Sequence, residues 1–87
     1  MSYSIRFRPG VERDMSRLPR AVLLRIDKAI MALAHMPRPS GCKKLAGQAG
    51  LYRIRVGDWR IVYEIDDASR VIIIAIVGHR SDVYRGL

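Results

Sequence analysis

The pattern of apolar and polar residues predicts a strand and two helices in the first half of the chain. Apolar side chains occupy every second position of residues 2–8, which is typical of a half-buried strand. Residues 11–18 carry apolar side chains at helical spacing and predict a short amphipathic helix. A second helix is expected over residues 20–35, because Pro19 suits the start of a helix and Pro37 ends one.

Three further strands are predicted in the second half. Residues 51–56 and 59–65 alternate in polarity, and Gly57-Asp58 between them predicts a tight turn. A turn at residues 66–69 leads to residues 71–77, which are apolar throughout and indicate an interior strand.

The order of these elements predicts one α+β domain over residues 1–87. We expect two layers in the order β-α-α-β-β-β, with a mainly antiparallel four-stranded sheet and both helices on one of its faces. Residues 38–50 form a Gly-rich basic connection, which Leu45 anchors to the core. A short turn or helix, for which Ser81 is a candidate cap, ends the chain.

Composition adds an expected class of partner to this fold. The chain has 87 residues and a formal net charge of +8; of its 16 basic residues, 13 are arginine. Such a small basic domain usually binds a polyanion, although excess charge also serves solubility. No long apolar segment or secretion signal is evident, and Cys42 is the single cysteine. We expect a cytoplasmic protein with no membrane association, disulfide, metal or cofactor.

Arginines gather on one side of the predicted hairpin. Tyr52, Ile54 and Val56 share one face of the first strand, which leaves Arg53 and Arg55 on the other. The same argument puts Ile61, Tyr63 and Ile65 opposite Arg60, Val62 and Glu64 on the second strand. The apolar sets must meet the helices, so the three arginines lie together on the helix-free face. Because like charges this close repel each other, an external anion is expected to complete the surface.

Other residues are expected near these arginines. Arg80 has the alternation parity of Ile72, Ile74, Ile76 and Gly78, and if that parity belongs to the helix-free face, Arg80 projects near Arg60. Tyr84 follows at the same edge, and Lys43 and Lys44 precede the hairpin. Together they predict a basic concavity with one aromatic ring, suited to single-stranded RNA. A solvated polar face with a few salt bridges is the alternative.

The end of the second helix is apolar nearly all round. Residues 29–34 read AIMALA, whereas a helix that packs on one side only has one apolar face. Either this segment is deeply buried, or its far side covers a partner. The residues proposed for such contact are Ile30, Met31 and Ala34.

Several stretches resemble the RelE/ParE superfamily, toxins of bacterial type II toxin–antitoxin systems. The resemblance rests on LYRIRVGDWRIVYEIDD (51–67), VIIIAIVGHRSDVYR (71–85), RLP (17–19) and KKLAG (43–47), in order along essentially the whole chain. The combination of LYRIRVGD-x-RIVYEI with VGHR-x-DVY is typical of the RelE branch. The fold that it implies agrees with the two-layer α+β prediction.

This resemblance implies a ribosome-dependent messenger RNA interferase that cuts the A-site codon and is neutralised by an antitoxin. The family's active positions fall on Arg53, Arg55, Arg60, Arg80 and Tyr84. Lys43 and Lys44 are expected as RNA contacts because of their place before the hairpin, not because of the resemblance. In the implied reaction the 2′-OH attacks the adjacent phosphate and leaves a 2′,3′-cyclic phosphate. Such a reaction needs a proton acceptor, a proton donor and positive charge on the phosphate, but no metal.

One departure from the family pattern concerns the proton acceptor. RelE has two lysines on the first hairpin strand, where this chain has Arg53 and Arg55, and arginine stays protonated at any working pH. His79 has a suitable intrinsic pKa, but its parity points it away from Arg80. Glu64 is a lesser candidate and more naturally an arginine partner. Tyr63 is expected in the core, and Cys42 is expected to be an incidental loop thiol.

Two alternative functions stay open. ParE-like members share the fold but poison DNA gyrase and lack the RelE catalytic set. A module that grips RNA without cutting it also fits the arginine substitutions.

Overall fold

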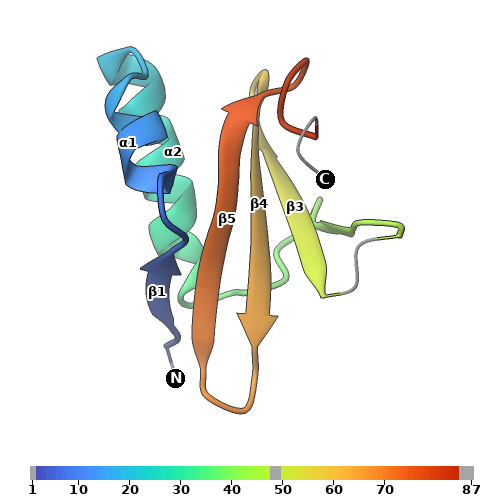
Figure 1. The fold of residues 1–87 in the computed structure, drawn as a ribbon. Coiled ribbons are helices and arrows are strands. Elements are labelled where there is room, and N and C mark those ends of the chain that lie inside the picture. The colour runs from blue at the N-terminus through green and yellow to red at the C-terminus, as the bar shows by residue number, and fades with distance from the viewer. Residues whose placement is uncertain (1, 48–49, 85–87) are drawn as a thin grey trace.

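The computed structural model describes residues 2–47 and 50–84, which form two helices packed on a five-stranded sheet (Figure 1). The helices are α1 (Val11–Ser16) and α2 (Arg20–Leu33). The strands are β1 (Ser4–Phe7), β2 (Lys43–Lys44), β3 (Leu51–Val56), β4 (Trp59–Asp66) and β5 (Val71–His79). Their spatial order is β1-β5-β4-β3-β2, with β1 parallel to β5 and the other neighbours antiparallel. The α+β prediction is confirmed, and β5 is an interior strand as expected.

The prediction of four strands was one too few. Lys43 and Lys44, expected in a loop, pair with Arg53 and Tyr52 as a two-residue edge strand. Both lysines are exposed, which suits the edge of a sheet because charged side chains there discourage pairing with another chain.

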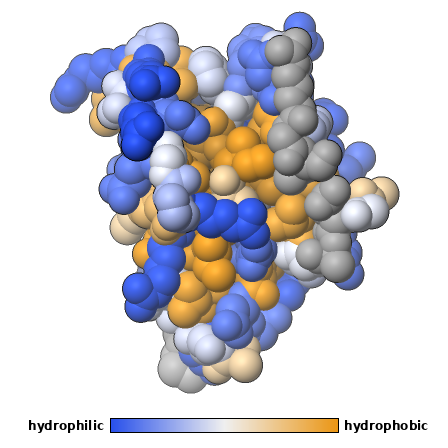
Figure 2. Space-filling model, in the orientation of Figure 1, coloured by the Kyte–Doolittle hydropathy of each residue, from blue (hydrophilic) through white to orange (hydrophobic). Residues whose placement is uncertain are grey.

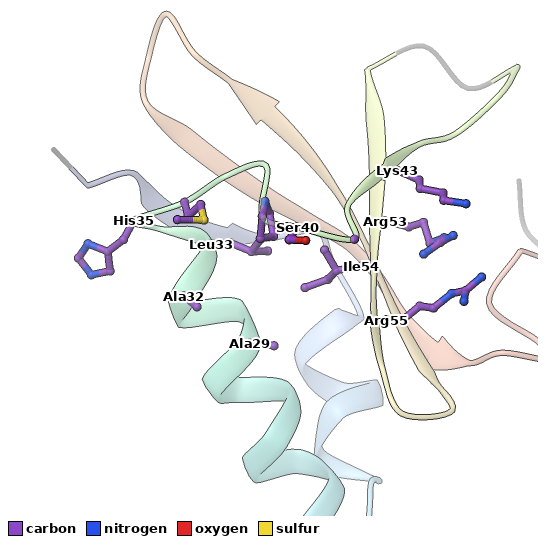
Figure 3. Close-up of a pocket in the computed structure, with 12 residues that line it drawn as sticks. Ala29, Ala32, Leu33, His35, Ser40, Lys43, Arg53, Ile54 and Arg55 are labelled. Carbon is purple, nitrogen blue, oxygen red and sulfur yellow. The ribbon is translucent and has the colours of Figure 1, made fainter.

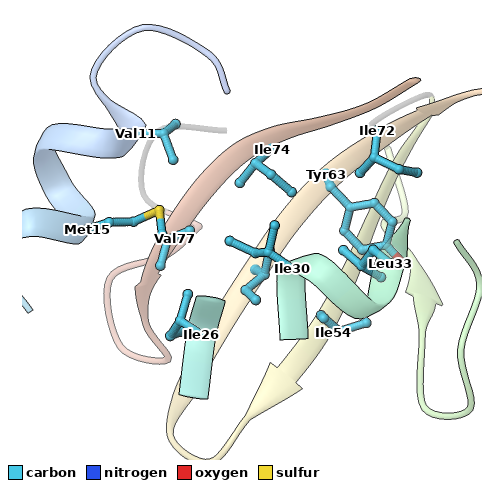
Figure 4. Packing of buried hydrophobic residues seen from close by; sticks show 11 residues of the cluster. Val11, Met15, Ile26, Ile30, Leu33, Ile54, Tyr63, Ile72, Ile74 and Val77 are labelled. Atoms are coloured by element: carbon cyan, nitrogen blue, oxygen red, sulfur yellow. The ribbon is translucent and has the colours of Figure 1, made fainter. Parts of the chain in front are cut away.

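Most apolar side chains predicted to be buried meet between the helices and the sheet (Figure 4). Ile26, Ile30 and Leu33 of α2 pack against strand residues such as Ile61 and Tyr63, and all five are 1% exposed or less. Burying these large side chains removes apolar surface from water, which stabilises the fold by about 1.5–3 kcal/mol per residue. Figure 2 shows hydrophobic residues gathered in the middle of one face, with hydrophilic residues around them.

A β-bulge in β5 changes which residues share a face. Val62 pairs with Ile76 while the next residue, Tyr63, pairs with Ile74, so Ala75 is an extra residue on β5. Ile72 and Ile74 therefore lie in the helix-side core, whereas Ala75 and Ile76 pack on the opposite, helix-free face. The parity set Ile72, Ile74, Ile76 and Gly78 was thus wrong, because an unbroken alternation does not survive an inserted residue.

The helix-free face carries a second, smaller apolar cluster. Leu51, Val62, Ala75 and Val83 are buried together there, and Leu45 packs against them. Leu45 thus anchors its loop to this cluster and not to the main core. Residues 80–84 form a turn that lies on the side of the sheet opposite the helices (Figure 1). Any helix beyond it would lie outside the described residues. No helix in the described ranges is long and apolar enough to cross a membrane.

Candidate active site

Two arginines face each other directly across the β3–β4 hairpin. Arg55 pairs with Arg60, and Arg53 pairs with Val62 in the same ladder. Cross-strand partners have Cβ atoms about 5 Å apart, so the two guanidinium groups repel each other. Among the described residues, the ion pairs are Arg8–Glu64, Arg38–Asp67 and Arg80–Asp58, and none of them involves a hairpin-strand arginine. None of these three ion pairs neutralises Arg53, Arg55 or Arg60, whose positive charge gathers on the helix-free face.

Arg60 and Arg80 meet at the turn between β3 and β4. Nη1 of Arg60 donates hydrogen bonds to the carbonyl oxygens of Gly57 at 3.0 Å and Trp59 at 2.9 Å. The main-chain N–H of Arg80 donates to the carbonyl oxygen of Asp58 at 2.8 Å. The Arg80 Nε lies 3.9 Å from the Asp58 carboxylate, and both side chains are about two-thirds exposed. Such an exposed pair is weak, so a phosphate can compete with Asp58 for Arg80.

Arg53 differs from Arg55, Arg60 and Arg80 in being only 7% exposed. Its side chain makes no hydrogen bond within the described part of the chain, where no fully buried side-chain nitrogen or oxygen lacks a partner. Its aliphatic stem is therefore buried while its guanidinium reaches solvent. Figure 3 shows Lys43, Arg53 and Arg55 projecting from the same side of the hairpin edge, with Ile54 on the other side.

The two lysines before the hairpin lie on different faces. Lys43 pairs with Arg53 and so belongs to the helix-free face, whereas Lys44 pairs with Tyr52, whose side chain packs on the helix side. Lys44 was therefore misplaced in the predicted basic group. The reason is that β2 is a strand, in which successive side chains point to opposite faces, and not an irregular loop.

The C-terminal turn, which ends with Tyr84 in the described residues, packs on the same face. Its neighbour Val83 is buried in the apolar cluster of that face, and Tyr84 itself is 41% exposed. The structure therefore gathers Arg53, Arg55, Arg60 and Lys43 on the helix-free face, with Arg80 and Tyr84 at the end of β5.

Of the candidate proton acceptors, His79 faces the helix side, whereas Glu64 lies on the helix-free face, opposite Leu51. His79 is the cross-strand partner of Trp59, whose ring packs on the helix-side core. The two rings meet edge-on, with their centres 5.5 Å apart. Nδ1 of His79 is 2.9 Å from the Ser81 hydroxyl. Glu64 pairs with Arg8, as the expectation of an arginine partner required. Ser81 thus contacts His79 and caps no helix in the described residues.

A groove of about 660 Å³ lies beside the basic residues, between α2 and the outer edge of β3 (Figure 3). Its walls include Ala29, Ala32 and Leu33 of α2 and Ile54 of β3, with Lys43, Arg53 and Arg55 at the rim. Residues 39–41 close one end. The sequence patterns did not predict this groove. Ala29 and Ala32, two small residues three positions apart on the helix, are the sequence feature that could have indicated it.

The loop that closes the groove is fastened at three points. The Tyr63 hydroxyl donates to the Pro37 carbonyl at 2.7 Å and lies 3.2 Å from the Cys42 sulfur. Arg38 forms an ion pair with Asp67 at 2.9 Å and lies over the Tyr52 ring, 5.3 Å from its centre. The Arg38 hydrogen bond lowers the pKa of Asp67, and the Tyr3 hydroxyl bonded to the same carboxylate adds to this.

The far side of α2 is apolar and exposed in part. Leu24 and Met31 of α2 are each 57% exposed, and Met36 just beyond the helix is 60% exposed. Ile30, however, is fully buried, and Ala34 is 7% exposed. Of the three residues expected to contact a partner, only Met31 is on the surface, because the other two face the core.

Comparison with known proteins places this arrangement in a family. Residues 5–84 match the family described as the ParE toxin of the type II toxin–antitoxin system parDE. The chain belongs to this RelE/ParE toxin family. Toxin RelG of Mycobacterium tuberculosis is 34% identical over 86 residues, which cover 98% of this chain and 99% of that protein. Toxin RelE of the same organism is 30% identical, over 95% of this chain and 87% of that protein.

Solved structures of RelE proteins have the same fold. The RelBE2 toxin–antitoxin complex of M. tuberculosis contains a chain with a TM-score of 0.81 and 30% identity, covering 92% of this chain and 100% of that one. A chain of the archaeal RelE–RelB complex from Pyrococcus horikoshii has a TM-score of 0.80 and 29% identity, covering 92% and 97%. The resemblance stated from the sequence motifs is confirmed.

Proposed function

We propose that this chain is the toxin of a type II toxin–antitoxin pair and acts as a ribosome-dependent messenger RNA endoribonuclease in the cytoplasm. The observation that carries the proposal is the group of cations around the hairpin, Arg53, Arg55 and Arg60, none of which belongs to the ion pairs found among the described residues. Arg80 and Tyr84 lie at the adjacent end of β5. A positively charged surface suits an RNA strand that the ribosome already holds in position. RelE-type relatives that match along nearly the whole chain support the assignment.

In the proposed reaction the 2′-oxygen of the RNA forms a bond to the adjacent phosphorus, and the bond from phosphorus to the 5′-oxygen breaks. The products are a 2′,3′-cyclic phosphate and a free 5′-hydroxyl. Arg60 and Arg80 bind the phosphate and stabilise the negative charge that develops on its oxygens in the transition state. Such electrostatic stabilisation is usually the largest single contribution to catalysis. Tyr84 stacks on or orients the nucleotide, while Arg53, Arg55 and Lys43 hold the strand.

None of the candidate residues in this site is suited to accept the proton of the 2′-hydroxyl. Arg53 and Arg55 remain protonated, His79 faces the helix side, and Glu64 is paired with Arg8. We therefore propose a slower route in which solvent takes the 2′-hydroxyl proton and also protonates the departing 5′-oxygen, while the arginines supply the electrostatic stabilisation. This route involves no metal or cofactor.

We also propose that a cognate antitoxin covers the apolar side of α2 and the groove beside β3. The solved RelE structures include complexes with RelB antitoxins, and Met31, Leu24 and Met36 here expose apolar surface that a partner can bury. Lys43, Arg53 and Arg55 at the groove rim favour an acidic segment, since complementary charge speeds association and sets specificity.

A reconstituted translation assay tests the catalytic proposal. Ribosomes programmed with a defined message are mixed with the protein, and the RNA ends are mapped. We expect cuts within the A-site codon that are absent without ribosomes and absent in the Arg60→Ala/Arg80→Ala variant. The matched control is Arg13→Ala/Arg17→Ala, which removes the same charge from exposed positions on or next to α1, on the helix side of the sheet.

Other results would assign a different function. RNA protected without cyclic-phosphate ends would indicate binding without cleavage. No cuts, together with arrested DNA supercoiling by purified gyrase, would indicate a gyrase poison. Equal cleavage by the two arginine double variants would show that the site lies elsewhere.

A further inference from the structure

We propose that Val83 is a positioning residue, which seats the C-terminal turn on the helix-free face and thereby places Tyr84 beside the arginines. The inference rests on the proposed function and adds a residue that does not itself touch the RNA. Among residues 80–84, Val83 alone is buried, at 3% exposure, while its neighbours in the turn are exposed.

The seat of Val83 is built from three strands. Leu51 of β3, Val62 of β4 and Ala75 of β5 are buried with it in one cluster, apart from the main core. Ala75 faces this side because it is the residue inserted at the bulge. The bulge therefore supplies part of the surface on which the turn rests.

Gly78 of β5 lies directly against the turn at Val83. A Cβ placed on Gly78 would lie 3.5 Å from the Val83 Cα and 3.6 Å from its Cβ. Gly78 is not among the residues with positive φ, so its backbone does not require glycine. A glycine inside a strand that does not serve the backbone often marks a close approach of another segment.

The turn is also closed by its own hydrogen bonds. The main-chain N–H groups of Asp82 and Val83 both donate to the carbonyl oxygen of His79, at 2.9 Å and 3.0 Å. Tyr84 follows directly, and Gly78 pairs with Arg60 across the sheet. Seating Val83 thus fixes the start of Tyr84 near Arg60 before RNA arrives, which lowers the ordering cost that binding would otherwise carry.

Amide hydrogen exchange tests the seating without any cleavage assay. Removing two carbons in Val83→Ala should raise exchange at Asp82 and Val83 about tenfold, while amides of β4 keep their protection. Gly78→Val should have a similar effect because its branched side chain meets Val83. Gly78→Ala is the matched control, since contacts of 3.5–3.8 Å are ordinary ones. Unchanged exchange in Val83→Ala and Gly78→Val would overturn the proposal.

Cleavage by ribosome-bound protein then tests whether Val83 acts through Tyr84. Val83→Asp should unseat the turn and slow cleavage to the rate of Tyr84→Ala, and Val83→Ile should restore the wild-type rate. The double variant Val83→Asp/Tyr84→Ala should be no slower than Tyr84→Ala alone. Losses that multiply in the double variant would overturn the route through Tyr84. If the wild type does not cleave, the proposed function fails, whereas the exchange result still decides the seating.

Discussion

The substitution Tyr63→Phe measures how much the hydrogen bonds of the Tyr63 hydroxyl contribute to stability, apart from the packing of its ring. The side chain is fully buried between α2 and the sheet, and its hydroxyl holds Pro37 at 2.7 Å. Tyr63→Phe keeps the ring and leaves no large cavity. It removes one donor from the Pro37 carbonyl and one contact from the Cys42 sulfur, at the loop that closes the groove.

The expected loss follows from that geometry. A typical hydrogen bond contributes about 1 kcal/mol net, and a buried partner left without its donor adds a penalty, so Tyr63→Phe should cost about 1–2 kcal/mol. For a domain of this size, we expect a fall in melting temperature of about 5–10 °C.

Urea unfolding followed by circular dichroism measures this loss. The midpoint should fall while the slope with urea stays unchanged, because the surface exposed on unfolding is the same. Tyr3→Phe is the control: it removes a hydroxyl at the surface, bonded to Asp67 at 2.7 Å, and should cost less. A midpoint equal to that of the wild type, or an equal loss in both variants, would refute the reasoning.

The same variant should also change how stability depends on pH in the alkaline range. Burial raises the pKa of Tyr63, so its neutral form is favoured in the folded state. The stability that this provides is complete below the pKa of an unfolded tyrosine, about 10, and is lost as the pH rises above it. Wild-type stability should therefore fall more steeply above pH 10 than that of Tyr63→Phe.

Two further predictions concern the partner surface and acid stability. Met31→Glu should weaken antitoxin binding, measured by calorimetry, about tenfold or more, and should leave RNA cleavage in the translation assay intact. Ala21→Glu, at the exposed start of α2, is the control. Unchanged affinity in Met31→Glu would disprove docking on this side of α2. Because Arg38 lowers the pKa of Asp67, the stability from this carboxylate is present above its unfolded pKa, about 3.9, and is lost as the pH falls through the lower folded value. Asp67→Asn should therefore melt below the wild type at pH 7, with a smaller gap at pH 2; a gap that does not depend on pH would contradict this.

Alternation and helical spacing were sufficient to predict most of the architecture. The strand at β1, both helices, the hairpin and the interior strand β5 lie where the patterns put them, with α2 ending at Leu33, two residues earlier than expected. These signals are local, because a half-buried strand or helix must turn its apolar side chains to one face. The placement of Arg53, Arg55 and Arg60 on the helix-free face follows from the same rule.

The sequence by itself determined the fold class, the toxin family and which hairpin residues share a face. Only the tertiary structure decided that Ala75 forms a bulge and that Lys44 faces away from Lys43. It also decided that Val83 is buried on the sheet. Each of these depends on a pairing between segments distant in sequence, and alternation along one strand carries no information about the register of its neighbour.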